Sequence, residues 1–291
     1  MNKHFLNLKE YGPTKVRELV YAAHELKKGS HHGNLDGKYL ALIFEKSSTR
    51  TRLSFEVAMN QLGGKASFLS VKDLQLGRGE PISDTSRVIS SMADAIVLRT
   101  LKHSTLEEFA ESSSVPIING LTDLSHPCQL LADMLTFIEH KGSIENKKVC
   151  WVGDCNNVCY SYMEAAEIFN FKLIIVCPDE YQPKDIKLNN NVELTNSIDI
   201  GLKDADLVTT DVWVSMGDEK DSKRRLSSFS DYQISPTVMD KAKGDAIFLH
   251  CLPAVRGQEI SIDMLDDPRS KVWKQAENRL HAQKSLLLDL L

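Results

Sequence analysis

The stretch Lys38–Arg52, KYLALIFEKSSTRTR, joins an apolar run to a polar segment that opens a helix. The run at 38–44 is short and mostly apolar, which is typical of a strand buried inside a sheet. Four apolar residues then recur at helical spacing: Phe55, Ala58, Met59 and Leu62. A buried strand that leads directly into an amphipathic helix is the repeating unit of α/β folds.

The same alternation continues on both sides of this stretch. We predict further strands at 65–70, 95–99, 115–119, 147–153, 172–177, 192–195, 206–213 and 246–253. We predict helices at 13–28, 86–93, 127–140, 160–169 and 276–291, and one that a capping box at Ser104-x-x-Glu107 opens. The pattern predicts an α/β fold of two doubly wound domains, each with a mostly parallel sheet flanked by helices.

The boundary between the two domains is expected near Lys141-Gly142, at the end of a long amphipathic helix. We therefore predict a first domain at 1–141 and a second at 142–275. The C-terminal helix at 276–291 is expected to pack back on the first domain.

The composition excludes several functional classes. The 291 residues are 42% hydrophobic and 26% charged with a net charge of −5, so nothing favours nucleic acid or a membrane as partner. No segment approaches the ~20 apolar residues that span a bilayer, and the first residues, MNKHFLNLKEYGPTK, lack a signal peptide pattern. We expect a cytoplasmic protein.

The six cysteines include no C-x-x-C pair, and several lie inside apolar runs. We expect buried free thiols rather than disulfides or zinc ligands. No set of residues has the spacing of a metal site, so no metal is expected.

The segment Ser47–Arg52 offers an anion site. The start of a helix presents unpaired backbone N–H groups, and hydroxyls and a guanidinium beside them would surround a phosphate. The alternative is that Ser48 only caps the helix while Arg50 and Arg52 are solvated. The segment lacks the glycines and lysine of a nucleotide-binding P-loop.

Polar side chains also follow other predicted strands. Arg99 ends one strand, His126 stands at the start of the 127–140 helix, and Asp211 follows a third strand. A neutral histidine at a helix start can polarise a carbonyl oxygen, and a carboxylate can bind a substrate ammonium. The alternatives are that Arg99 forms a surface salt bridge, that His126 is an ordinary hydrogen-bonded histidine, and that Asp211 caps a turn.

Three further segments are candidates. Gly153–Asn157, GDCNN, is a strand-to-helix turn without the G-x-G-x-x-G fingerprint, which excludes a nicotinamide cofactor, and no other cofactor is expected. Cys251 ends a strand, where its thiol either packs inertly or contacts a reacting amine. Arg279 can reach back to the anion site of the first domain.

The order of these segments resembles the aspartate/ornithine carbamoyltransferase family across nearly the whole chain. The segments that carry the resemblance are FEKSSTRTRLSFE, Arg99, LSHPCQLLADMLT, GDCNN, DVWVSMG, HCLPAVRGQE and AENRLHA. The resemblance implies a metal-free transfer of the carbamoyl group of carbamoyl phosphate to an amine.

The acceptor is implied by three local choices, at Cys251, at the SMG loop and at the intact STRTR segment, which relatives that act on acetylornithine or succinylornithine usually alter. Enzymes of this family that act on aspartate have proline where this chain has Cys251, and they lack the SMG loop. Ser215 and Met216, four and five residues after Asp211, match the branch that acts on L-ornithine, with citrulline as product and arginine biosynthesis as the expected role. The alternatives are a putrescine enzyme, which shares a similar HCLPA-x-RG stretch, and a non-catalytic homologue that binds an amino acid.

The resemblance also implies roles for single residues. The carbamoyl phosphate site would comprise Ser48, Thr49, Arg50, Thr51, Gln75, Arg99, His126, Gln129, Cys251, Leu252 and Arg279. The ornithine site would comprise Asn157, Asp211, Ser215 and Met216. Cys251, Asp211, Arg99 and His126 would be catalytic. A homotrimer is implied as well, in which Gln75 helps to complete the site of a neighbouring subunit.

Overall fold

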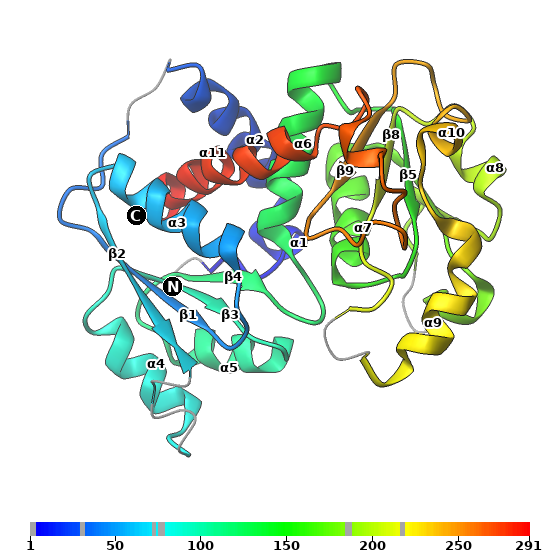
Figure 1. The fold of residues 1–291 in the computed structure, drawn as a ribbon. Helices are drawn as coiled ribbons and strands as arrows, with labels where there is room; N and C mark the ends of the chain where they lie inside the picture. Colours follow the sequence, from blue (N-terminus) through cyan, green and yellow to red (C-terminus); the bar gives the residue numbers. More distant parts are fainter. Residues whose placement is uncertain (1–3, 30–32, 72–73, 75–78, 184–187, 216–218) are drawn as a thin grey trace. The chain divides into compact units, whose positions relative to one another are not determined.

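The computed structural model describes residues 4–29, 33–71, 74, 79–183, 188–215 and 219–291 (Figure 1). The chain forms two compact units. Unit 1 comprises Met1–Leu135 and Glu277–Leu291, and unit 2 comprises Thr136–Ala276. The division falls inside helix α6 (Pro127–Lys141), whose last residue is the boundary expected from the sequence, and inside helix α11 (Val272–Leu290).

Unit 1 is built on a four-stranded parallel sheet in the order β2-β1-β3-β4. Its strands are β1 (Tyr39–Phe44), β2 (Lys65–Ser70), β3 (Ala95–Arg99) and β4 (Ile117–Leu121). Its other helices are α1 (Leu8–Tyr11), α2 (Pro13–Lys27), α3 (Thr49–Gln61), α4 (Ile82–Ser90) and α5 (His103–Ser112). The chain leaves β1 for β2 on one side and later returns to β3 on the other. The carboxyl ends of β1 and β3 therefore meet at a topological switch point, where ligands of such sheets bind.

Unit 2 repeats this plan with a five-stranded parallel sheet in the order β7-β6-β5-β8-β9. Its strands are β5 (Lys148–Val152), β6 (Lys172–Val176), β7 (Val192–Thr195), β8 (Leu207–Thr210) and β9 (Ile247–His250). Its other helices are α7 (Asn157–Phe169), α8 (Ile198–Leu202), α9 (Ser222–Ser228) and α10 (Pro236–Met239). Short 3₁₀ turns lie at η3 (Asp179–Tyr181), η4 (Glu219–Asp221), η5 (Ser230–Tyr232) and η6 (Met264–Asp266). Here the switch point lies between β5 and β8.

The central strands are buried because helices cover both faces of each sheet, as parallel sheets require. In β3 and β8 every residue is buried, and in β1 only the first residue is exposed. A ligand can therefore contact the side chains at the ends of the strands, but not those within the buried strands.

The fold class predicted from the sequence is confirmed, but some helix starts were predicted wrongly. Helix α5 begins at His103 and not after a capping serine at position 104, because the His103 N–H donates to Asp123 Oδ1 over 2.9 Å. The C-terminal helix begins at Val272, four residues before the predicted start at Ala276.

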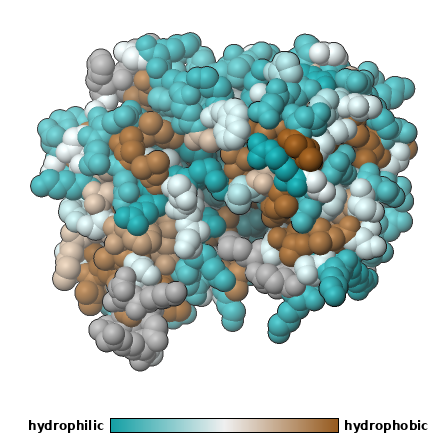
Figure 2. Space-filling view, in the orientation of Figure 1, coloured by the Kyte–Doolittle hydropathy of each residue, from teal (hydrophilic) through white to brown (hydrophobic). Residues whose placement is uncertain are grey.

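Polar side chains dominate the face shown in Figure 2, and apolar side chains form separate patches on it. Among the described residues, no helix combines the length and the apolar character that crossing a membrane requires.

Candidate active site

The N-terminus of α3 lies directly after β1, at the switch point of unit 1. Ser48 is the N-cap residue, and its hydroxyl accepts a hydrogen bond from the Thr51 N–H at 3.2 Å. Thr49 is exposed and Arg50 is half-buried, while Thr51 is buried. The helix start thus presents backbone N–H groups, hydroxyls and a guanidinium together, which is the composition of an anion site.

Arg279 joins the C-terminal helix to this segment. Its guanidinium donates from Nη2 to Thr51 Oγ1 at 3.2 Å and from Nη1 to Gln129 Oε1 at 2.7 Å. The amide nitrogen of Gln129 in turn donates to Asp133 Oδ1 at 2.8 Å. Arg279 is only 2% exposed, so these contacts hold a positive charge in a fixed position inside unit 1.

His126 is the buried imidazole of this site. Burial lowers its pKa well below the usual value, and the charges of Arg279, Arg99 and Arg50 lower it further. The ring is therefore neutral and keeps one N–H as a donor. Arg99 is the last residue of β3 and is 9% exposed. The positive charges of three guanidinium groups thus disfavour protonation of one imidazole at the carboxyl edge of the sheet.

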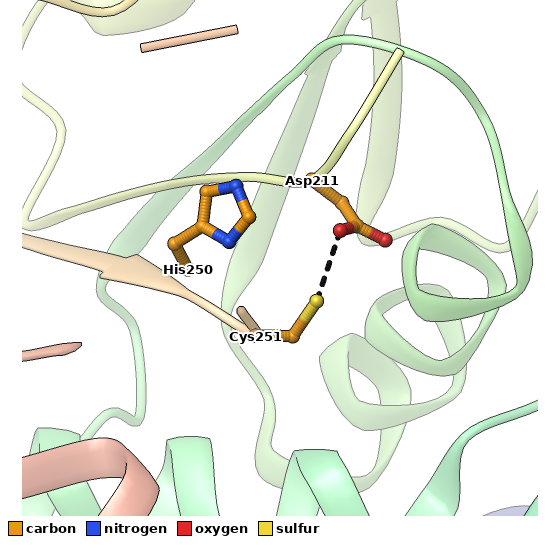
Figure 3. Close-up of side chains that lie close together, drawn as sticks. All are labelled: Asp211, His250 and Cys251. Carbon is orange, nitrogen blue, oxygen red and sulfur yellow. Dashed lines mark hydrogen bonds between the residues drawn. The ribbon is translucent and has the colours of Figure 1, made fainter. Parts of the chain in front are cut away.

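Asp211 is the centre of a second cluster, in unit 2. The Cys251 thiol donates to Asp211 Oδ1 at 3.0 Å, and Figure 3 shows the sulfur directed at that carboxylate. The amide nitrogen of Asn156 donates to Asp211 Oδ2 at 2.7 Å and also lies 3.3 Å from Ser215 Oγ. These side chains follow β5, β8 and β9, whose carboxyl ends meet at one edge of the parallel sheet. The result is an acidic group whose two oxygens are both held by donors.

His250 precedes Cys251 and belongs to a buried pair. Its Nδ1 accepts a hydrogen bond from the Leu252 N–H at 2.9 Å, so the ring proton resides on Nε2, 3.2 Å from Glu259 Oε1. The side chains of His250 and Glu259 are both 0% exposed. Leu252 has a φ of 57°, in the left-handed region, which turns the chain sharply after Cys251.

Asp211, His250 and Cys251 offer ligand atoms that all lie within 4.8 Å of one another. Both ring nitrogens of His250 are already engaged, however, with the Leu252 N–H and with Glu259. A metal ion would need one of those nitrogens, so the hydrogen-bonded arrangement fits a metal poorly.

Asp154, which lies in the turn that also carries Asn156, forms an ion pair with Arg225. Arg225 Nη1 lies 2.9 Å from Asp154 Oδ2 and also donates to the Trp213 carbonyl oxygen at 3.3 Å. The pair links the turn after β5 to helix α9. It fixes the segment 153–157, which also carries Asn156.

The structure gathers most of the residues that the sequence singled out. Residues of the expected carbamoyl phosphate set lie together in unit 1: Ser48, Thr49, Arg50, Thr51, Arg99, His126, Gln129 and Arg279. Cys251, Leu252, Asp211, Ser215 and Asn157 lie in unit 2. Asn157 is the first residue of α7, one position after the asparagine that contacts Asp211. Gln75 and Met216 lie outside the described residues.

Sequence reasoning missed three contributors to these clusters. Asn156 holds Asp211, Glu259 holds His250, and Arg225 holds Asp154. The signal for Asn156 was present, because asparagine is a favoured N-cap and the residue stands at the start of a helix. Glu259 and Arg225 were not identified, since each meets a partner at the end of a separate strand: His250 ends β9, nine residues before Glu259, and Asp154 follows β5.

Comparison with known proteins gives concordant results over both units. Residues 3–139 match the family model "Aspartate/ornithine carbamoyltransferase, carbamoyl-P binding domain". Residues 145–290 match "Aspartate/ornithine carbamoyltransferase, Asp/Orn binding domain".

Individual relatives match along almost their full length. The chain is 54% identical to an ornithine carbamoyltransferase of Psychrobacter sp. strain PRwf-1, over 99% of this chain and 97% of that protein. It is 52% identical to "Ornithine carbamoyltransferase 1, anabolic" of Pseudomonas savastanoi pv. phaseolicola, over 98% of this chain and 95% of that protein. The solved ornithine carbamoyltransferase of Pyrococcus furiosus superposes with a TM-score of 0.92 at 43% identity, covering 100% of this chain and 97% of that one. The chain therefore belongs to the aspartate/ornithine carbamoyltransferase family.

Proposed function

We propose that this chain is an enzyme that transfers the carbamoyl group of carbamoyl phosphate to the side-chain amine of L-ornithine. The products are L-citrulline and phosphate, and the role is arginine biosynthesis. The observation that carries this proposal is 54% identity over 99% of the chain to a protein named ornithine carbamoyltransferase. A relative of 52% identity named as anabolic supports the biosynthetic direction.

Carbamoyl phosphate binds at the anion site of unit 1 in this proposal. Ser48, Thr49, Arg50 and Thr51 hold the phosphate through the start of α3 and their own side chains. Arg279 adds its charge and is itself held by Gln129 and Thr51. This role is supported by the concentration of cationic groups around a helix N-terminus, where anions are stabilised.

Arg99 and His126 act on the carbamoyl oxygen. As the amine adds to the carbonyl carbon, negative charge develops on that oxygen, and donors fixed beforehand stabilise it most effectively. A neutral His126 supplies an N–H without carrying an extra positive charge into a site that already holds three guanidinium groups. Gln129 holds the carbamoyl group from the same helix turn.

Ornithine binds to unit 2. Asp211 and Cys251 position the reacting amine, while Asn157, Ser215 and Met216 hold the α-amino acid end and Leu252 borders the reacting centre. Support comes from the carboxylate of Asp211, which is already oriented by Cys251 and Asn156. An amine of the lysine type has a pKa near ~10.4 in water, so the reacting form is the scarce neutral one.

The reaction is a direct displacement. The neutral amine attacks the carbonyl carbon, a tetrahedral intermediate forms, and its collapse breaks the bond to phosphate. The amine proton leaves with the departing phosphate, so no covalent intermediate with the enzyme is needed. Gln75 of a neighbouring subunit completes the phosphate site in the expected homotrimer.

The domain roles and the assembly follow the same proposal. In this proposal residues 1–141 with the helix at 276–291 bind carbamoyl phosphate, and residues 142–275 bind ornithine. The two roles are supported by the descriptions of the family models that match residues 3–139 and 145–290, and the second of these matches also includes the C-terminal helix. Association into a homotrimer rests on the family resemblance alone. Location in the cytoplasm stays a prediction.

The decisive experiment measures the carbamoylated product when carbamoyl phosphate is offered with ornithine, putrescine or aspartate at equal concentration. Rapid formation of citrulline, with little product from the other two amines, is the expected result. Preference for putrescine would overturn the choice of acceptor. No product from any of the three would overturn the assignment as an enzyme and favour an amino-acid-binding homologue.

A further inference from the structure

Asp133 is a buried acidic residue of helix α6 to which the proposed reaction gives no role. Its side chain is 1% exposed, and acidic side chains are rarely buried without a partner. Asp133 Oδ1 accepts a hydrogen bond from Gln129 Nε2 at 2.8 Å. The two residues are four positions apart and therefore share one face of the helix. Asp133 thus contacts a residue that the proposed function places at the carbamoyl group.

The amide group of Gln129 is held at both of its ends. Its oxygen, Oε1, accepts from Arg279 Nη1 at 2.7 Å, while its nitrogen donates to Asp133. The backbone of Gln129 is held as well, because its N–H donates to the carbonyl oxygen of His126 at 3.0 Å. Gln129 is 2% exposed, so water competes little for these contacts. The side chain therefore has one defined orientation within unit 1.

The chemistry of the two neighbours decides which end of the amide faces which residue. A guanidinium group has only donors, so the atom of Gln129 that faces Arg279 must be the amide oxygen. The amide nitrogen then faces Asp133, where a carboxylate oxygen accepts. If the amide turned over, two donors would face each other at Arg279 and two acceptors at Asp133. Arg279 and Asp133 therefore favour the same orientation of Gln129 independently of each other.

This orientation leaves an acceptor beside the anion site of unit 1. An amide oxygen has two lone pairs, and the hydrogen bond from Arg279 uses one of them. Arg279 Nη2 also donates to Thr51 Oγ1 at 3.2 Å, so the Gln129 oxygen lies next to a group that contacts the start of α3. The NH2 of a carbamoyl group can donate to the remaining lone pair. An acyl phosphate with a methyl group in place of this NH2 cannot.

We propose that Asp133 is a positioning residue that makes the enzyme select a carbamoyl donor over other acyl phosphates. Asp133 holds the Gln129 amide with its oxygen toward Arg279 and the substrate, so that this oxygen accepts from the substrate NH2. Asp133 itself does not touch the substrate and acts through Gln129. The selection rests on the proposed function, in which unit 1 binds carbamoyl phosphate, whereas the orientation of Gln129 does not.

The test compares two stable ligands, phosphonoacetamide and acetonylphosphonate. Both carry a phosphonate and a carbonyl group, and they differ only in an NH2 or a CH3 on the carbonyl carbon. Titration calorimetry with the whole enzyme measures the Kd of each. We expect the wild type to bind phosphonoacetamide roughly 10-fold or more tightly than acetonylphosphonate. Asp133→Ala should weaken phosphonoacetamide roughly 10-fold and leave the Kd of acetonylphosphonate almost unchanged.

Further variants of the two residues separate the hydrogen bond from the packing of α6. Asp133→Asn keeps an acceptor oxygen and should retain most of the preference for the amide ligand. Asp133→Leu replaces the carboxyl group with an apolar side chain and should lose the preference, which keeps the test decisive where Asp133→Ala does not fold. Gln129→Ala with and without Asp133→Ala completes a double-mutant cycle, in which the second substitution should add almost nothing.

Asp206→Ala is the matched control, because it removes another buried carboxylate. Asp206 lies directly before β8 in unit 2, is 3% exposed, and accepts from the Lys148 N–H at 3.0 Å and from Lys243 Nζ at 2.8 Å. Its loss should lower the stability of the chain and leave the Kd of both phosphonates unchanged.

Each other outcome contradicts a distinct step. Equal losses for the two ligands in Asp133→Ala, or a loss in Asp133→Asn as large as in Asp133→Ala, would overturn the selection. Effects of Gln129→Ala and Asp133→Ala that multiply would show that Asp133 does not act through Gln129. A wild type that makes citrulline but binds the two ligands equally would overturn the selection and leave the proposed function standing. The expected Kd values in a chain that never makes citrulline would overturn the proposed function and leave the orientation of Gln129 by Asp133 standing.

Discussion

Arg279 concentrates several functions in one side chain. It belongs to the C-terminal helix, is almost fully buried, and donates to both Gln129 and Thr51. A charged hydrogen-bond donor of this kind is worth ~1.5–3 kcal/mol, which corresponds to roughly 10- to 150-fold in affinity. We therefore expect Arg279→Ala to raise the KM for carbamoyl phosphate by roughly 10- to 150-fold, with a smaller effect on the KM for ornithine.

Steady-state kinetics with each substrate varied in turn check this expectation. The exposed Arg87→Ala removes a guanidinium whose nearest carboxylate, Asp84, is 3.8 Å away, and it should leave both constants unchanged. An Arg279→Ala enzyme with the wild-type KM for carbamoyl phosphate would refute the role of Arg279 in the anion site.

His126 makes stability depend on pH. Its pKa in the folded chain lies well below the usual value, first because of burial. Below a pH of about 6.5 the unfolded chain binds a proton that the folded chain does not, so stability falls as pH falls, by up to about 1.4 kcal/mol per unit. His126→Gln should lose this part of the dependence between pH 7.5 and pH 5.5.

Urea unfolding at the two pH values measures the difference. The exposed His140→Gln removes an imidazole of helix α6, which begins directly after His126, and should retain the wild-type dependence. Equal slopes for His126→Gln and the wild type would show that folding does not lower the pKa of His126.

At the scale of elements, the start of α7 serves the helix and the site together. Asn156 caps the helix by accepting from the N–H groups of Val158 and Cys159, and its amide nitrogen holds Asp211. Asn156→Ala should cost ~1 kcal/mol of stability through the lost cap. It should also raise the KM for ornithine, because Asp211 loses one of its two donors.

The matched control is Ser235→Ala. Ser235 caps α10 in the same unit by accepting from the Val238 N–H at 3.2 Å. Thermal unfolding should show a similar loss for the two variants, and kinetics should show a changed KM for ornithine only in Asn156→Ala. A changed KM for ornithine in both variants would mean that the effect comes from a general loss of stability and not from the contact with Asp211.

Elements were the features that sequence predicted best. The strands followed from short apolar runs, and the long helix at 127–140 from its regular apolar face, because burial on a fixed period leaves a readable pattern. The helix starts were less accurate. The start of α5 is decided by Asp123, a residue far along the chain that accepts from His103, and no local pattern announces such a partner.

The residues of the site that directly follow strands could also be predicted, because the strands themselves could be recognised from their apolar runs. Asp211 and Cys251 each follow a strand, and parallel neighbouring strands bring their carboxyl ends to one edge. The partners that hold these residues, Glu259 and Arg225, were missed. They come from loops and a short helix, where position depends on tertiary contacts and not on a periodic pattern.

At the scale of the whole molecule, the chain leaves unit 1 in α6 and returns to it in α11. The returning segment contributes Ala282, Leu286 and Leu287 to the buried residues of unit 1. Loss of a single buried leucine side chain typically costs ~2–5 kcal/mol, and removal of the whole segment exceeds the stability of an ordinary domain. A chain that ends at Ala276 should therefore have a folded unit 2 and an unfolded unit 1.

Amide hydrogen exchange distinguishes the two units. In the truncated chain, β1 and β3 should lose protection, while β5 and β6 should keep it. A chain that lacks only Leu291 is the control and should protect all four strands. Persistent protection of β1 and β3 in the truncated chain would mean that the core of unit 1 is stable without α11.

At position 252, the backbone conformation and the packing of the core favour different residues. The Leu252 backbone has a φ of 57°, a conformation that costs a leucine ~1–2 kcal/mol and a glycine almost nothing, yet its side chain packs against the buried core of unit 2. Glycine suits the backbone at this position and leucine suits the core. A library screened only for heat resistance would therefore accept substitutions at position 252 on their effect on stability alone, even where they change the turn that carries Cys251. Directed evolution of this enzyme should hold Leu252 constant and look for thermal stability elsewhere.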